Sequence, residues 1–585
     1  MAKGEGGLTG SISWQMQHTN LQAKKWWHKL LPITLWLPHY KPSLLRFDLF
    51  GGIALASYVL PASMAYAVLA GLHPQAGIYC YLVGGVIFAF FTTSKQVALG
   101  PTSAISLLVG TTLGALAQGD VAKWAAMSAF AALGVGLISM AAYTVRLNTL
   151  VNFISETVLL GFKTGAAITI GITVVPDLLG INGGGNDFFQ RIGYIFNHIG
   201  EANPTVYIFG IIAFTLLIFG EKYFKGKPTS LIIMALSMVL MGYTGLGSLG
   251  FKMVGPLSPG LPNFALPTLD MKQMATMADL IFACFLLAYI ESVSAARTLA
   301  SKHRYEVDTR QELLSIGAGN IGVSLFGGFP IGGGLSQSLV NDQAGARTPI
   351  SLIVCSLVLA SVLLFFSGII GYLPQVILSA ILLQAVLGLF MYKDLKRLFF
   401  LDKREFLVAM VALIGVVFFG ILKGVVVAAL LSLALLLHQT ANPYLAILGR
   451  IGYSGRFSDI QRHPDNTLID HILILRVESS FLYFNAQYIH DSILTAIGKA
   501  PTRVKILILD MSSAAIVDVA GSQMLAELNK ELLKSDIQLK IAEPLATVRD
   551  ILRKQGIEET TGHLSRKLSL EDIVNESTAE LGQGA

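Results

Sequence analysis

The chain has 585 residues, of which 53% are hydrophobic and only 13% are charged. A soluble globular protein carries about 25% charged residues, so this composition excludes a soluble protein and indicates an integral membrane protein with a mean hydropathy of +0.63. Residues 1–439 hold 27 basic and 18 acidic residues, and this excess does not indicate nucleic-acid binding because basic residues orient membrane loops.

The first segment, residues 1–47, contains lysines together with Trp26, Trp27 and Trp36 just before the first apolar span. Basic residues and tryptophans in this position are typical of a cytosolic segment at the membrane interface. No disulfide framework or metal site is expected, because the three cysteines lie in apolar spans without a pairing pattern.

Fourteen apolar segments follow, counted against the roughly 20 residues that a helix needs to cross a bilayer. They are expected at residues 48–69, 74–91, 101–117, 122–143, 153–174, 205–220, 229–245, 277–297, 312–326, 335–344, 350–367, 374–390, 405–421 and 424–437. Segments 101–117 and 335–344 are short and begin at glycine or proline breaks. When the fourteen segments are divided into two halves of seven, each of these is the third segment of its half. Because irregular backbone is not tolerated against lipid, such matched breaks indicate a transporter binding site.

The loop charges support an even number of spans. If the N-terminus is cytoplasmic, 15 basic residues lie in inner loops and five in outer loops. This asymmetry follows the positive-inside rule. It predicts a multi-pass protein of the plasma or inner membrane, with both termini in the cytoplasm.

The character of the chain changes at about residue 439. Ile472–Val477 and Val504–Leu509 are apolar, β-branched runs of strand length, and amphipathic helical spacing occurs further along. Alternating strands and helices predict a small soluble α/β domain at 439–560. Residues 561–585 are polar and acidic, and we expect a flexible tail there.

The membrane part carries short motifs in a definite order. They are Leu60-Pro61-Ala62-Ser63-Met64-Ala65-Tyr66-Ala67, Gly100-Pro101-Thr102-Ser103-Ala104, Gly161-Phe162-Lys163-Thr164-Gly165-Ala166-Ala167, Glu291-Ser292-Val293-Ser294 and Val340-Asn341-Asp342-Gln343-Ala344-Gly345-Ala346. Each motif is weak alone, but the ordered set resembles the sulfate permease (SulP) family of anion transporters over nearly the whole chain.

This resemblance implies the fold class. It is an all-α polytopic membrane domain at 48–438, whose 14 segments form a 7+7 inverted repeat, at about 48–247 and 277–438, divided into core and gate domains. A cytosolic α/β STAS domain would follow at 439–560. The resemblance also implies a homodimer in the lipid bilayer and an anion held between the N-termini of the third and tenth helices. A cytosolic protein partner at the STAS domain is a further expectation.

Two half-helices there would direct free N–H groups and positive dipole ends at one point. We expect the binding residues to be Thr102, Ser103, Ala104, Leu335, Ser336 and Gln337, with walls from Ala62, Tyr66, Phe285 and Tyr289. For the aromatic residues, ordinary packing is the alternative. A helix end stabilises an anion by about 0.3–1 kcal/mol, whereas full desolvation costs tens of kcal/mol. Polar side chains, water or a cation must therefore contribute.

Many members of the family carry Arg at the position of Gln337 and Gln at that of Ala62. A neutral amide removes a fixed positive charge, which favours a proton or sodium ion as the coupling ion and no other cofactor. Glu291, inside the eighth span, is the candidate for coupling, because an ionisable group there costs on the order of 3 kcal/mol and burial favours its neutral form. The alternative is a structural carboxylate paired with Arg297 or Lys163.

In the STAS domain, the candidate regulatory loop contains Asp510, Ser512, Asp518 and Gly521. Relatives that act as phosphorylation switches carry Ser at the position of Ala520, so a simple kinase switch is not expected here.

The predicted function is secondary active import of a small inorganic anion, first of all sulfate, coupled to protons through alternating access. Sodium-coupled bicarbonate transport, proton-coupled dicarboxylate transport and anion exchange are alternatives. A membrane-anchored STAS regulatory protein is a different class. No nucleophile–base set, metal cluster or phosphate loop in the sequence supports an enzyme.

Overall fold

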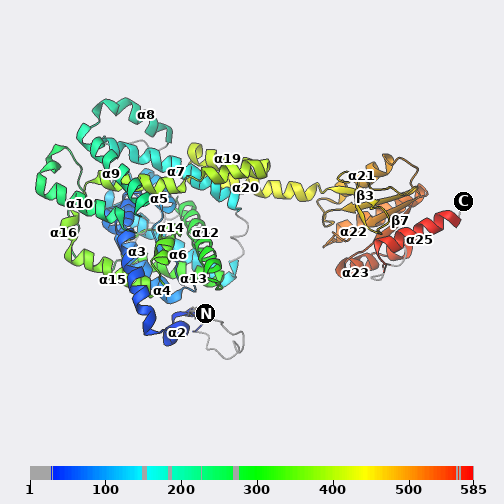
Figure 1. Ribbon diagram of the computed structural model, residues 1–585, viewed down its shortest axis with the longest axis horizontal. Coiled ribbons are helices and arrows are strands. Elements are labelled where there is room, and N and C mark those ends of the chain that lie inside the picture. Colours follow the sequence, from blue (N-terminus) through cyan, green and yellow to red (C-terminus); the bar gives the residue numbers. More distant parts are fainter. Residues whose placement is uncertain are drawn as a thin grey trace, which may run out of the picture. The chain divides into compact units, whose positions relative to one another are not determined.

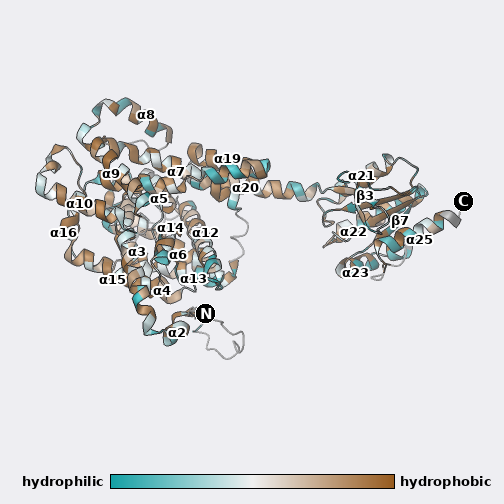
Figure 2. Cartoon of the chain, viewed as in Figure 1, coloured by the Kyte–Doolittle hydropathy of each residue, from teal (hydrophilic) through white to brown (hydrophobic). Residues whose placement is uncertain are grey.

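The computed structural model describes residues 28, 30–147, 155–181, 188–224, 227–267, 276–561, 564 and 568–583. It contains two compact units, Met1–Ser432 and Leu433–Ala585. The described part of the first unit is almost entirely helical and mostly hydrophobic, whereas the second combines a sheet with helices of mixed polarity (Figures 1 and 2). The predicted fold class, a helical membrane part followed by an α/β STAS domain, is confirmed.

The apolar helices of the first unit follow the predicted spans closely. They are α3 (Pro42–Leu69), α4 (Pro74–Phe91), α5 (Ser103–Ala117), α6 (Val121–Val145), α7 (Glu156–Leu179), α9 (Pro204–Tyr223), α10 (Thr229–Thr244), α12 (Ala278–His303), α13 (Thr309–Ser324), α14 (Leu335–Gln343), α15 (Ile350–Phe365), α17 (Gln375–Leu389), α19 (Lys403–Phe419) and α20 (Ile421–Ala441). Among the described residues, seven helices are long and apolar enough to cross a membrane. Two-residue strands, β1 (Leu99–Gly100) and β2 (Gly332–Gly333), precede α5 and α14.

Some elements differ from the prediction. Helix α3 begins at Pro42 rather than residue 48, because a proline suits the first turn of a helix. Two further helices, α8 (Phe188–His198) and α18 (Tyr392–Leu401), lie where connections were expected. Both are too short for a span and are amphipathic, with exposed aromatic side chains, as in helices that lie in the membrane interface.

The remaining short elements of this unit are α2 (Ile33–Trp36), η2 (Leu37–His39), η4 (Ile199–Glu201), η5 (Leu246–Leu249) and α16 (Ser367–Ile370). Helix α2 and turn η2 belong to the predicted interfacial segment. Trp26 and Trp27 of that segment lie outside the described residues.

The helices pack in two groups. In one group, α3 packs against α4, α14 and α15, α13 against α4 and α6, and α12 against α5 and α6. In the other, α7 packs against α9, α17 and α19. Small residues permit these close approaches, since a Cβ at Gly161 of α7 would lie 2.0 Å from the Ala409 carbonyl of α19. The two groups meet where α3 contacts α10 and α17 and where α5 contacts α7.

A buried carboxylate holds the loop before β1 against α13. Glu312 is fully buried and accepts hydrogen bonds from the Thr92 hydroxyl (3.0 Å), the Thr93 hydroxyl (2.9 Å) and amide (3.0 Å), and the Ser94 amide (3.2 Å). These groups all act as donors toward it. The network therefore positions the strand that leads into α5.

Replacing Glu312 with Gln should weaken this part of the fold. The new amide N–H2 would face donors, and an unsatisfied buried group costs about 1–3 kcal/mol. We expect the free energy of unfolding in detergent to fall by about that amount, measured by denaturant titration. The control is Glu306→Gln in the exposed loop before α13, which should leave stability unchanged. Equal stability of Glu312→Gln and the wild type would contradict the role of this carboxylate.

The second unit is built on a five-stranded sheet in the order β4-β3-β5-β6-β7. Its strands are β3 (Leu445–Arg450), β4 (Phe457–Asp459), β5 (Ile472–Val477), β6 (Ile506–Asp510) and β7 (Gln538–Ala542), and its helices are α21 (Ala486–Gly498), α22 (Val519–Lys534), α23 (Ala546–Lys554), α24 (Glu558–Thr561) and α25 (Leu570–Gln583). Strands β5, β6 and β7 are parallel, while β3 runs antiparallel to its neighbours. Both predicted strand runs form central strands.

The expectation of a flexible tail is wrong for α25, which covers one face of the sheet. Leu570, Ile573 and Val574 of α25 are buried against strand residues including Ile472 and Ile508. The alternate residues of the same strands face α21, α22 and α23. The apolar residues of α25 recur at helical spacing on one side, and this narrow stripe is hidden in an otherwise acidic composition.

Candidate anion-binding site

The two broken segments of the sequence meet in the structure through a short antiparallel ribbon. Leu99 pairs with Gly333 and Gly100 pairs with Gly332. Helix α5 begins at Ser103 and α14 at Leu335, directly after these strands. Because antiparallel strands leave a ribbon at opposite ends, the two helices run apart and their N-termini face each other across it.

The first turns of both helices offer free backbone donors. Thr102 caps α5, and its hydroxyl accepts from the Ile105 amide at 3.5 Å. Within the described part of the chain, no acceptor is found for the amides that open α5 and α14. These amides belong to Ser103, Ala104, Leu335, Ser336 and Gln337. Five N–H groups at two helix ends are a suitable environment for an anion.

Glycines allow the ribbon to approach the surrounding helices. A Cβ at Gly332 would lie 3.0 Å from the Ala288 Cα of α12, and a Cβ at Gly333 would lie 2.9 Å from the Ser292 Cα. A Cβ at Gly100 would lie 2.1 Å from the Tyr81 ring. The Ser292 hydroxyl also accepts from the Gly333 amide at 2.7 Å. Larger residues at these glycines would displace the half-helices.

The side chain of Gln337 serves the fold as well as the site. Its Oε1 accepts from the Tyr81 hydroxyl at 2.6 Å, and its Nε2 donates to the Ala98 carbonyl at 3.1 Å. Ser338 bonds to the Ala98 amide at 3.0 Å, and Asn341 bonds to the Gln96 carbonyl at 2.9 Å. These hydrogen bonds attach the polar face of α14 to the segment that leads into β1. The backbone N–H of Gln337 remains available to a ligand.

Replacing Tyr81 with Phe tests this attachment. The variant leaves the buried Gln337 Oε1 without its donor, which costs about 1–3 kcal/mol, so we expect both lower stability and weaker anion binding. Anion-dependent shifts of the melting temperature in detergent measure both. Tyr372→Phe, a 55% exposed position, is the control that should change neither. Unaltered anion binding in Tyr81→Phe would argue against a positioning role for this hydroxyl.

Glu291 lies where α12 passes the N-terminus of α5. Its carboxyl group lies near the Thr102 hydroxyl, and the charge of Lys163 of α7 acts on it without forming a close ion pair. Its Oε2 is buried, and no donor for it occurs among the described residues. Of the two structural partners considered from the sequence, Lys163 acts electrostatically on Glu291. Glu291 and Lys163 belong to the two different helix groups.

The predicted wall residues divide between the site and the packing around it. Tyr66 of α3 lies near Glu291 and Tyr58, and Tyr58 lies near the Ser336 side chain. Ala62 is buried on the same helix. Phe285 and Tyr289 of α12 stack with ring centroids 6.3 Å apart, and the Tyr289 hydroxyl donates to the Thr309 carbonyl of α13 at 3.2 Å. Tyr289 therefore bonds toward α13.

Three residues of this region were not singled out from the sequence: Tyr58, Tyr81 and Ser292. Each makes its contact with a residue far away in the chain, so no local pattern marks its role. Tyr58 precedes Ala62 by one helical turn, and this spacing on the same face of α3 is the one sequence signal that could have pointed to it.

The predicted regulatory loop of the second unit has structural contacts. Asp518 caps α22, accepting from the Gly521 amide at 2.8 Å and from the Tyr483 amide at 2.7 Å. Asp510 accepts from the Ser512 amide at 2.9 Å. A Cβ at Gly521 would lie 2.6 Å from the Phe481 carbonyl oxygen. Ser512 is exposed.

Comparison with known proteins agrees with this architecture. The model of the sulfate permease family matches residues 45–412, and the STAS domain model matches residues 463–570. The chain belongs to the sulfate permease family. The resemblance found in the motifs is thereby confirmed, and this family member is an anion transporter.

Individual relatives extend over most of the chain. Sulfate transporter 4.1, chloroplastic, of Arabidopsis thaliana is 31% identical over 568 residues, covering 94% of this chain and 82% of the relative. High affinity sulfate transporter 1 of Stylosanthes hamata is 29% identical, covering 93% of this chain and 85% of the relative. The solved structure of SLC26A9 has a TM-score of 0.85 and 24% identity, covering 95% of this chain and 94% of that chain, and so shares its fold.

Proposed function

We propose that this member of the sulfate permease family imports sulfate coupled to protons, by alternating access of a core domain against a gate domain. The pairing of β1 with β2 is the observation that carries the proposal, since it brings two helix N-termini to one place. The names of the plant relatives favour sulfate among the possible anions.

The proposed site binds sulfate through the backbone amides and hydroxyls at Thr102, Ser103, Ala104, Leu335 and Ser336, with the backbone N–H of Gln337. Hydrogen bonds to an ionised acceptor are about twice as strong as neutral ones. Each helix end adds about 0.3–1 kcal/mol, and up to roughly 2 kcal/mol in a partly buried site. Binding of this strength allows the carrier to release its cargo.

The proposed coupling runs through charge repulsion. An ionised Glu291 beside Thr102 opposes a dianion, because two unit charges about 6 Å apart at an effective dielectric of about 20 repel by about 3 kcal/mol. A proton on Glu291 removes this repulsion. Sulfate and proton then favour each other's binding by the same factor, as linkage requires. A sodium ion near Glu291 would likewise reduce the repulsion between Glu291 and sulfate.

The same proton would act on movement. Glu291 of α12 interacts with Lys163 of α7, across the boundary between the two helix groups. Neutral Glu291 loses this attraction. The helix group that contains α5 and α14, which we assign to the core, is then released from the group that contains α7, which we assign to the gate. The proposal includes a homodimer in the cell membrane with both termini in the cytoplasm, and a cytosolic protein partner at the STAS domain.

Uptake by the purified full-length protein in liposomes tests the proposal. Labelled sulfate, bicarbonate and fumarate are each offered under an inward proton gradient, an inward sodium gradient or no gradient. We expect sulfate to accumulate only with the proton gradient. Accumulation of bicarbonate with sodium, or of fumarate with protons, would replace sulfate by that substrate. Exchange without accumulation under any gradient would overturn coupled import.

A further inference from the structure

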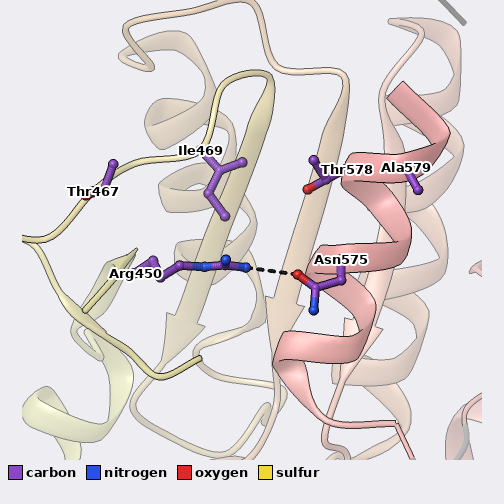
Figure 3. A pocket seen from close by; sticks show the side chains of 6 residues that line it. All are labelled: Arg450, Thr467, Ile469, Asn575, Thr578 and Ala579. Carbon is purple, nitrogen blue, oxygen red and sulfur yellow. Dashed lines mark hydrogen bonds between the residues drawn. The ribbon is translucent and has the colours of Figure 1, made fainter. Parts of the chain in front are cut away.

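A concave site lies in the STAS unit, and none of its lining residues belongs to the predicted regulatory loop. It is an open surface depression of 460 Å³ between the end of β3 and α25, and most of the residues that line it are exposed. Its lining residues are Arg450, Thr467, Ile469, Asn575, Thr578 and Ala579. Figure 3 shows the Arg450 side chain reaching across to Asn575 of α25, with Ile469, Thr578 and Ala579 on one side of that bond. Strand, loop and helix thus each contribute to the lining.

Arg450 supplies a positive charge that forms no ion pair with the described residues. One guanidinium nitrogen donates to Asn575 Oδ1 at 3.1 Å, while the buried Nε finds no acceptor among the described residues. None of the ion pairs in the described part of the chain includes Arg450, and Glu580 of α25 pairs with Lys540 at 2.7 Å. The Phe457 ring lies 5.5 Å from the guanidinium carbon and supports it.

The size and lining of the depression define the ligand class. A depression of 460 Å³ has room for an organic ligand, since the sites of such ligands usually measure about 300–1,000 Å³. Ile469, Ala579 and the threonine methyl groups offer apolar contact, while the Thr578 hydroxyl donates within α25 to the Val574 carbonyl at 2.8 Å. We propose that this depression binds a small organic anion, whose carboxylate or phosphate group pairs with Arg450 and whose apolar part lies on Ile469 and Ala579.

Such a ligand would strengthen the attachment of α25. Its anionic group contacts Arg450 at the end of β3, and its body contacts Ala579 on the helix, so it bridges the two. Without ligand, the polar contacts of α25 in the described part of the chain include Arg450 with Asn575, Lys540 with Glu580, and the Leu570 amide with Glu543 at 3.0 Å. A ligand that binds only the docked helix lowers the population in which α25 detaches.

Hydrogen–deuterium exchange of the full-length protein in detergent tests the inference. The probes are phenyl phosphate and benzoate, with inorganic phosphate as the anionic group alone and benzyl alcohol as the apolar body alone. At ten times its dissociation constant, a bridging probe should slow exchange of α25 amides about tenfold. We expect this from phenyl phosphate or benzoate only. Protection by neither, or equal protection by inorganic phosphate, would overturn the proposal.

Variants separate the depression from other anion sites. Arg450→Met should abolish the protection, and Ala579→Phe should abolish it by filling the depression while Arg450 is retained. Arg462→Met is the control, because its side chain is 78% exposed on a neighbouring loop, and it should keep the protection. Protection that persists in both Arg450→Met and Ala579→Phe would refute the site. The readout is confined to α25 and so does not depend on which anion the membrane part carries.

Discussion

Glu291→Gln is expected to abolish proton-driven sulfate accumulation and to leave sulfate exchange in place. The substitution preserves the size of the side chain and an oxygen that can interact with Thr102, but it removes the titrating proton. The side chain at position 291 would then be neutral at every pH. Sulfate still binds and moves, but the proton gradient no longer drives it.

The measurement compares two assays on the same liposomes. An inward proton gradient should raise sulfate uptake by the wild type severalfold and leave Glu291→Gln uptake unchanged, whereas counterflow against internal unlabelled sulfate should be similar in both. Glu156→Gln, an exposed position at the start of α7, is the matched control and should behave like the wild type. If Glu291→Gln still responds to the gradient, another group carries the proton.

The membrane helices were predictable because their signal is local. Spans are read from hydropathy and length, and the breaks before α5 and α14 from glycine and proline, so the two short segments could be singled out as a pair. Their direct pairing, Leu99 with Gly333 and Gly100 with Gly332, joins residues more than 200 positions apart. No pattern within either segment specifies that register.

Side-chain roles were less predictable than backbone positions. Gln337 was expected to face the anion as a donor, but both ends of its amide bond to Tyr81 and Ala98. A polar residue at a half-helix start can turn to the ligand or to the protein, and only the distant partners decide. The helix α25 was missed for a related reason, because an acidic composition masked the few apolar residues that meet the sheet.

The ribbon itself provides the strictest test of the site. Gly333→Val should weaken sulfate binding strongly, because its new atoms meet Ser292, whose Cα and Oγ would lie 2.9 Å from a Cβ at that position. Overpacking of this kind costs about 1–3 kcal/mol. If this cost appears as a displacement of α14 from its binding position, it corresponds to roughly 5- to 150-fold weaker binding. Gly100→Ala should act from the other strand, since its Cβ would lie 2.1 Å from the Tyr81 ring.

Sulfate-dependent stabilisation in detergent separates a displaced site from an unfolded protein. A folded variant with a displaced ribbon keeps a cooperative melting transition but needs more sulfate for the same rise in melting temperature. Gly388→Ala is the control, because no atom lies within 4 Å of the added Cβ, and its sulfate response should match the wild type. If Gly333→Val and Gly100→Ala both bind sulfate as the wild type does, the anion is held elsewhere than at the half-helix N-termini, and the coupling assigned to Glu291 through Thr102 fails with it.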